Sequence, residues 1–296
     1  METLEFCPLC GSSNFKAIKR IIDYSTTSEE FSVCKCYACS LLFTNPRPDQ
    51  RSIGAYYNSP AYISHSNETK GLFAATYQAI RKQAIKKKFK WIKPYLNNEA
   101  TILDYGSGTG EFLNYCKTQG LRTVGVEIAE TARQKAISNY NLHVLNPERL
   151  NEIEPASVDL VTMWHVLEHL PDLSLSVDRI TNKLTPNGFL VIAVPNHESY
   201  DANLYEEYWA AWDVPIHFYH FSKESMGEFA KRHALELKQI IPMPFDAYYI
   251  SLLSEQYKTG HKRWLKALYN GFVSNRQGIP IDNTSSLTYI FKKLNT

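Results

Sequence analysis

The stretch Thr101-Ile-Leu-Asp-Tyr-Gly-Ser-Gly-Thr-Gly-Glu111 decides the fold of this chain. It places a short apolar segment directly before a glycine-rich turn, and a helical pattern follows from Glu111 to Gly120. Glycines in such a turn let the backbone adopt left-handed conformations and approach a ligand closely. A strand, a glycine turn and a helix in this order are typical of the ligand-binding unit of a parallel α/β sheet.

Strand and helix patterns alternate after this turn. Further strands are expected at residues 122–127, 142–145, 157–163 and 188–194, with helices from Ala129 and over 172–184 between them. A helix from Ser222 precedes two more strands, near residues 235–241 and 287–291. Strands that alternate with helices predict a parallel sheet covered on both faces. We therefore expect an α/β fold with a doubly wound, Rossmann-like, seven-stranded sheet.

Five of the six cysteines lie within the first 39 residues. Cys7 with Cys10, and Cys36 with Cys39, form two Cys-x-x-Cys pairs, and each pair suits two corners of a tetrahedral Zn²⁺ site. Four thiolates predict a closed structural zinc site. Cys34 is a spare thiol that could replace Cys36. Disulfides are the alternative, and they are disfavoured because the start of the chain does not resemble a signal peptide.

These patterns divide the chain into three parts. Residues 1–48 are expected to form a zinc-ribbon-like domain that ends at the stiff segment Asn45-Pro-Arg-Pro-Asp49. Residues 49–98 are expected to form a helical lid or linker, and residues 99–296 the sheet domain. An insertion near residues 197–222 carries tryptophans, tyrosines and histidines, and we expect it to bind the substrate.

Charge argues against a nucleic-acid partner. The 296 residues include 32 Lys and Arg against 30 Asp and Glu, and residues 1–50 carry five basic against six acidic side chains. Neither balance creates a field that attracts phosphates. Residues 81–93 hold seven Lys and Arg, which we interpret as an exposed helix face. Because the longest apolar run is Phe189–Val194, we expect no membrane span and a cytoplasmic location.

The glycine turn carries carboxylates where a dinucleotide site would need neutral donors. A nicotinamide site has the pattern Gly-x-Gly-x-x-Gly, but the sixth position of the run that starts at Gly106 is Glu111, and Asp104 lies two residues before the first glycine. These charges favour a cationic or zwitterionic ligand over a diphosphate. Glu127 ends the second strand, where a carboxylate can accept hydrogen bonds from both ribose hydroxyls.

Four features together resemble class I S-adenosylmethionine-dependent methyltransferases of the small-molecule branch that carries an N-terminal zinc-ribbon-like segment. They are Leu103-Asp-Tyr-Gly-Ser-Gly-Thr-Gly110, Glu127, Trp164-His-Val-Leu-Glu-His-Leu-Pro171, and the end of the ribbon, Cys36-x-x-Cys39-Ser-Leu-Leu-Phe-Thr-Asn-Pro-Arg-Pro48. The resemblance implies S-adenosylmethionine as the cofactor, and Asn146 stands where the family often has an aspartate for the adenine amino group. The cofactor-binding residues that it implies are Asp104, Gly106, Ser107, Gly108, Gly110, Glu127, Ile128, Asn146, His165, Tyr62 and His65.

The segment His165-Val-Leu-Glu168-His169 also matches His-x-x-Glu-His, a metalloprotease pattern. That pattern needs a long helix and a third metal ligand, whereas Pro171 ends any helix two residues later. We therefore set the protease interpretation aside and expect Glu168 and His169 to brace the turn.

Candidate acceptor-site residues follow the fifth strand. His217 or His220 could remove the acceptor proton, because an imidazole titrates near neutral pH, and Tyr219 is a weaker candidate. Alternatively, these histidines pack on the tryptophans and cap the helix at Ser222. The sequence thus predicts methyl transfer to a small molecule, such as a sugar, an envelope precursor or a secondary-metabolite precursor. The alternatives are an RNA methyltransferase that binds through the ribbon, and a non-catalytic cofactor-binding protein.

Overall fold

The computed structural model describes residues 1–57 and 72–294. Its central sheet has the strand order β10-β11-β8-β7-β4-β5-β6, which confirms the predicted seven-stranded, doubly wound architecture. The five neighbouring strands from β8 to β6 are parallel, whereas β11 is antiparallel to β8 and β10. The strands are β4 (Thr101–Tyr105), β5 (Arg122–Val126), β6 (Val144–Leu145), β7 (Val158–Trp164), β8 (Leu184–Pro195), β10 (Leu235–Pro242) and β11 (Ser286–Lys293).

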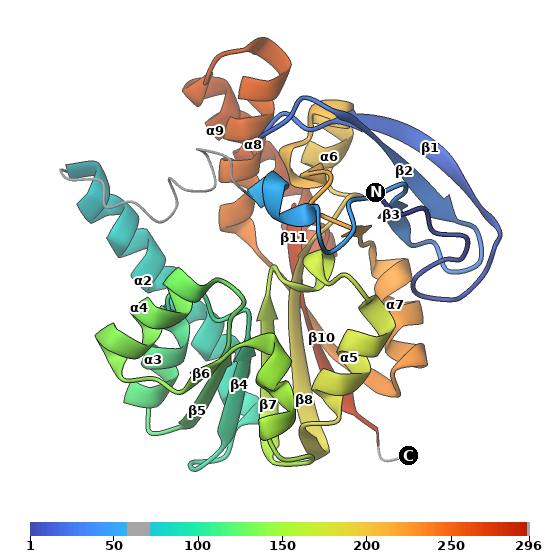
Figure 1. The fold of residues 1–296 in the computed structure, drawn as a ribbon. Coiled ribbons are helices and arrows are strands. Elements are labelled where there is room, and N and C mark those ends of the chain that lie inside the picture. The colour runs from blue at the N-terminus through green and yellow to red at the C-terminus, as the bar shows by residue number, and fades with distance from the viewer. Residues whose placement is uncertain (58–71, 295–296) are drawn as a thin grey trace.

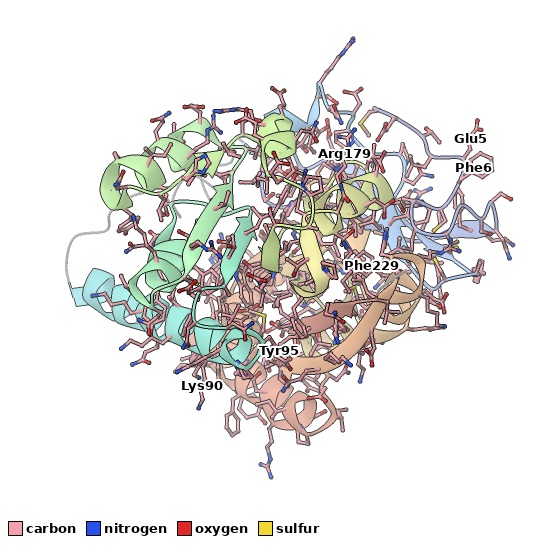
Figure 2. All side chains as sticks on the ribbon, turned by 90° about the horizontal axis from the view of Figure 1, so that it is seen from below. Glu5, Phe6, Lys90, Tyr95, Arg179 and Phe229 are labelled. Atoms are coloured by element: carbon pink, nitrogen blue, oxygen red, sulfur yellow. The ribbon has the colours of Figure 1, made fainter. Side chains whose placement is uncertain are left out.

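Helices cover both faces of this sheet because neighbouring strand residues point to opposite sides. Ile102 packs into the cluster formed with α2 (Leu72–Ile92), α3 (Glu111–Thr118) and α4 (Glu130–Tyr140). Leu103 packs into the other cluster, with α5 (Leu173–Thr181) and α7 (Lys223–Arg232). Figure 2 shows the two layers through Lys90 on α2 and Arg179 on α5, which lie on opposite sides of the sheet.

Local signals set where several helices begin and end. The side chain of Asp172 caps α5, and Ser222 forms a capping box with Ser225 at the start of α7. The helix predicted over residues 172–184 ends earlier, at Thr181, because β8 already begins at Leu184. Among the described helices, none combines the length and apolar character that crossing a membrane requires.

A second, four-stranded sheet carries the ribbon. Its order is β1-β2-β3-β9, with β1 (Phe15–Ile22), β2 (Glu30–Cys36), β3 (Leu42–Thr44) and β9 (Tyr219–His220). The fourth strand comes from the predicted insertion, because Leu42 pairs with His220 and Phe43 with Tyr219. The ribbon sheet therefore includes residues far beyond position 48.

Arg47 anchors the ribbon to the sheet domain. Its side chain is 5% exposed, its Nε donates to Glu2 Oε1 at 2.7 Å, and its Nη1 donates to the Tyr219 hydroxyl at 3.0 Å. Its Nη2 donates to the Pro171 carbonyl at 2.6 Å. The segment from Asn45 to Asp49, expected as an extended break, thus docks against the sheet domain.

The remaining elements gather at the carboxyl ends of the parallel strands, beside the ribbon (Figure 1). They are η1 (Ile53–Tyr57), η4 (Leu167–His169), α6 (Tyr200–Tyr205), η5 (Glu206–Tyr208), η6 (Ala210–Trp212), α8 (Pro244–Thr259) and α9 (Trp264–Gly278). Three short helices complete the fold: η2 (Lys93–Tyr95), η3 (Pro147–Glu152) and η7 (Ile279–Ile281). Tyr62 and His65, predicted to lie over the cofactor, fall outside the described residues.

Candidate functional site

The glycine turn after β4 combines close packing with an open position. Gly106 and Gly110 have φ of 81° and 84°. A Cβ at Gly106 would lie 2.3 Å from Val166 Cγ2, and one at Gly110 would lie 2.7 Å from Leu142 Cδ1. Gly108 also has a positive φ, of 54°, but a Cβ there would meet open space. The turn is therefore held tightly at both ends and leaves room above Gly108.

Glu127 is fixed directly over this turn. Its Oε2 accepts a hydrogen bond from the Gly108 N–H, and its Oε1 accepts one from the Ala129 N–H, both at 2.8 Å. An ionised carboxylate has about four acceptor positions, so Glu127 can still accept two hydroxyl groups. Ile128 beside it is 78% exposed and presents an apolar surface next to the carboxylate.

Asp104 lies below the turn, at the end of β4. It is 2% exposed and its Oδ1 accepts a hydrogen bond from Thr162 Oγ1 at 2.6 Å. Burial raises the pKa of Asp104 to about 6, although the Thr162 hydrogen bond and the charge of Lys88 oppose the rise. Burial also lowers the pKa of Lys88, whose Nζ lies 4.4 Å from the centre of the Trp164 ring.

Sequence reasoning missed Lys88, because it treated the basic run of residues 81–93 as exposed. The signal was present in the spacing. Lys88 is three residues after Ile85 and four before Ile92, so it shares their inward helix face. Arg81 is also engaged: its Nη2 lies 2.9 Å from Glu111 Oε1. Glu111 is thus ion-paired with α2, whereas Asp104 forms no direct ion pair among the described residues.

Ser107 and Asn146, which the resemblance implies as cofactor-binding residues, differ in their hydrogen bonding. Ser107 is 8% exposed, and its hydroxyl oxygen has no hydrogen-bond partner among the described residues. Asn146 follows β6 and caps η3, because its Oδ1 accepts from the Glu148 N–H at 3.0 Å. The oxygen expected to receive the adenine amino group is therefore engaged in the cap.

His165 follows β7 in a left-handed conformation, with φ of 58°, which is uncommon for a residue with a side chain. Its Nε2 lies 3.1 Å from Asp246 Oδ2 and its Nδ1 lies 3.4 Å from Glu168 Oε1. Burial alone would lower the pKa of His165, but the two carboxylates outweigh it and raise the pKa to about 9. Asp246 lies in the first turn of α8, and only the tertiary structure brings it to this site.

The three predicted acceptor-site residues separate in space. The ring of His217 lies 4.7 Å from that of His169, next to Glu168. His220 packs instead on Trp212, with ring centres 5.0 Å apart, and its Nε2 lies 3.3 Å from Thr44 Oγ1. His220 thus has the surroundings that the packing alternative predicts.

Tyr219 shares the interface between the ribbon and the sheet domain. Its hydroxyl accepts from Arg47 and donates to the Pro171 carbonyl at 3.2 Å. Burial raises the pKa of Tyr219 and lowers that of His220 to about 3. Of the three candidates, His217 alone lies in the polar cluster at the end of β7.

The Sγ atoms of the four paired cysteines lie close together. The Sγ atoms of Cys7 and Cys39 are 3.6 Å apart, those of Cys10 and Cys36 are 3.4 Å apart, and all four lie within 4.8 Å of one another. These distances exceed the length of about 2.05 Å of a disulfide bond and approach the edge of about 3.8 Å of a tetrahedral zinc–thiolate site. Cys34 lies outside the cluster, with its Sγ 3.9 Å from the Asn45 carbonyl oxygen. The donor set therefore fits a structural Zn²⁺, with Cys36 rather than Cys34 as the fourth ligand.

Comparison with known proteins adds to this picture. A family model described as a methyltransferase domain matches residues 77–240. The ubiquinone biosynthesis O-methyltransferase of Neisseria meningitidis serogroup C is 31% identical over 104 residues, which are 32% of this chain and 44% of that protein. The corresponding protein of Idiomarina loihiensis is 30% identical over 102 residues, 32% of this chain and 42% of that protein. The chain thus spans less than half the length of these two relatives.

Solved structures share the fold. The phosphoethanolamine N-methyltransferase 2 of Haemonchus contortus has a TM-score of 0.54 at 20% identity, covering 86% of this chain and 63% of that one. A putative sarcosine dimethylglycine methyltransferase of Galdieria sulphuraria has a TM-score of 0.51 at 16% identity, covering 73% and 86%. The cyclase SpnF reaches 0.50 at 12% identity, covering 72% and 82%, so likeness of fold does not specify the reaction.

The family match extends over more than half of the 296 residues and includes the glycine turn, Glu127 and the segment after β7. The chain belongs to the methyltransferase domain family.

Proposed function

We propose that this protein binds S-adenosylmethionine and transfers its methyl group to a small-molecule acceptor. The observation that carries the proposal is the Glu127 carboxylate, which two backbone N–H groups hold over the open position at Gly108. A carboxylate in this place suits the two ribose hydroxyls, and the exposed side chain of Ile128 suits an adenine ring. Asp104 supplies a buried negative charge for a cationic ligand.

The acceptor binds, in this proposal, beside the cluster at the end of β7. Parallel α/β sheets bind ligands beyond the carboxyl ends of their strands, where His165 and His217 lie. Methyl transfer is an in-line displacement: the acceptor atom attacks the methyl carbon, the carbon–sulfur bond breaks, and the acceptor loses a proton. His217 is the candidate for taking that proton, because its Nδ1 lies 2.9 Å from the Ala211 carbonyl oxygen and donates to it, which leaves Nε2 to accept.

We infer that the acceptor atom is a hydroxyl oxygen. The support is that the curated relatives that match this chain are named as O-methyltransferases. We also propose that Cys7, Cys10, Cys36 and Cys39 hold a structural Zn²⁺ that stabilises the ribbon, because a segment of 48 residues is too short to be stable through a hydrophobic core alone.

Two measurements test the proposal. Calorimetric titration of S-adenosylmethionine into the wild-type protein is expected to show one binding site. Incubation with isotopically labelled S-adenosylmethionine and a fractionated metabolite extract is then expected to label a small molecule. Absence of binding would overturn the proposal, and labelling of RNA in place of small molecules would establish the nucleic-acid alternative.

A further inference from the structure

A second group of metal-ligating side chains lies at the end of β7. Glu168 and His169 come from η4, and His217 comes from the insertion 48 residues later in the chain. One ligand atom of each residue lies within 4.8 Å of the corresponding atom of the other two. His217 thereby adds a third ligand to Glu168 and His169, the two residues that the His-x-x-Glu-His pattern contributes to this group.

The Glu168 carboxylate is buried with little compensation. The residue is 0% exposed, and neither carboxylate oxygen accepts a hydrogen bond from any group in the described part of the chain. One ion pair compensates in part, with His165 Nδ1 3.4 Å from Oε1. Burying an ionised carboxylate costs several kcal/mol unless a cation or hydrogen bonds compensate for its lost hydration. The carboxylate therefore needs a further positive partner.

The two histidines are oriented as metal ligands are. His169 Nδ1 lies 3.0 Å from the Ile216 carbonyl oxygen, and His217 Nδ1 lies 2.9 Å from the Ala211 carbonyl oxygen. A carbonyl only accepts, so each Nδ1 carries the proton and each Nε2 keeps its lone pair. Such a hydrogen bond from the other ring nitrogen is the usual support of a metal-bound histidine.

We propose that Glu168, His169 and His217 bind a divalent transition-metal ion on the acceptor side of the active site. Two imidazoles and one carboxylate suit Zn²⁺, Fe²⁺ or Co²⁺, and three protein ligands leave coordination positions open. The role of the ion rests on the proposed function: an open position would bind and orient the acceptor oxygen next to the methyl donor. In the metal-bound protein His217 is a ligand rather than the base.

Cobalt distinguishes this site from the cysteine cluster. The protein, first loaded with one zinc ion per chain to fill the cysteine cluster, is titrated with Co²⁺ while its visible absorption and binding heat are recorded. Cobalt bound by nitrogen and oxygen gives weak visible bands, whereas thiolate ligands add intense charge-transfer absorption. We expect one cobalt site per chain without thiolate absorption. Glu168→Gln and His217→Gln are each expected to weaken cobalt binding at least tenfold.

His197→Gln is the matched control, because it removes an imidazole of the same insertion outside the cluster. It is expected to bind cobalt as the wild type does. The inference is overturned if the wild type carrying one zinc ion per chain binds no cobalt, or if both cluster variants bind it with wild-type affinity. Circular dichroism reports folding, and His169→Gln replaces any variant that fails to fold.

Titration of S-adenosylmethionine into the same samples separates the two proposals. Binding of S-adenosylmethionine without cobalt binding supports the proposed function and overturns the metal site. Cobalt binding without S-adenosylmethionine binding leaves the metal site in place and overturns the proposed function.

Discussion

Replacement of Glu127 by glutamine tests the cofactor site most directly. In the structure both carboxylate oxygens accept backbone hydrogen bonds, from Gly108 and from Ala129, at 2.8 Å each. A glutamine side chain has one oxygen and one NH₂ group. In either orientation of the amide, its NH₂ group therefore faces the N–H of Gly108 or of Ala129, which cannot accept a hydrogen bond. The amide also lacks the negative charge that would accept hydrogen bonds from the ribose hydroxyls.

The expected magnitude follows from these contacts. Losing a hydrogen bond to a charged acceptor costs about 1.5–3 kcal/mol, and 1.4 kcal/mol corresponds to a tenfold change in affinity. One such loss on the ligand side predicts that S-adenosylmethionine binds about 10- to 150-fold more weakly to Glu127→Gln. Because the Gly108 or Ala129 N–H is also left opposite a donor, the unliganded variant is expected to melt at a lower temperature.

Isothermal titration calorimetry measures the affinity of both proteins for S-adenosylmethionine. Glu130→Gln is the control, since Glu130 is exposed on the first turn of α4 and lies only three residues away. Its affinity is expected to stay within twofold of the wild type. An affinity of Glu127→Gln within twofold of the wild type would refute the placement of the ribose at Glu127.

Three further predictions concern the ribbon and the buried charges. Cys36→Ser is expected to lower the zinc content, measured by plasma mass spectrometry, by one ion per chain. Cys34→Ser is expected to keep the wild-type zinc content, because Cys34 lies outside the cluster. Equal zinc content in the two variants would contradict the four-cysteine site. Arg47→Met is expected to lower the free energy of unfolding in urea by about 3 kcal/mol, because three buried or partly buried hydrogen bonds are lost. The control Arg20→Met removes an exposed ion pair and is expected to change it by less than about 0.5 kcal/mol. The pKa of Asp104 is about 6, raised by burial, so its contribution to folding stability is complete below its usual pKa of 3.8 and is lost as the pH rises through 6. Binding of a cationic ligand depends on pH in the opposite sense, because it needs the ionised carboxylate. The affinity for S-adenosylmethionine, measured by calorimetry, is therefore expected to fall as the pH drops from 7 to 5, whereas the affinity of Asp104→Asn is expected to stay constant. A constant affinity of the wild type over this pH range would exclude Asp104 from ligand binding.

Sequence reasoning succeeded where the signal is local. Hydrophobic periodicity and glycines within a few neighbouring residues predict the seven strands, the helix from Glu111 and the glycine turn. These patterns predict the elements because the period of the side-chain directions differs between a helix and a strand and can be read from neighbouring residues.

It failed where the partner of a charged group is distant in the chain. Arg47 was counted as a ribbon charge but is buried against Tyr219 and Pro171. The charge of Glu111 was interpreted as favouring a cationic ligand, but its carboxylate pairs with Arg81. Neither partner can be inferred from spacing, because packing of separate elements decides which side chains meet.

The sequence by itself determined the parallel sheet, its glycine turn with Glu127, and the two cysteine pairs, since each of these depends on residues close together in the chain. The tertiary structure alone decided that β9 completes the ribbon sheet, that Asp246 faces His165, and that His217 joins Glu168 and His169. These contacts join segments from different elements, and their geometry arises only when the hydrophobic clusters on both faces of the sheet have closed.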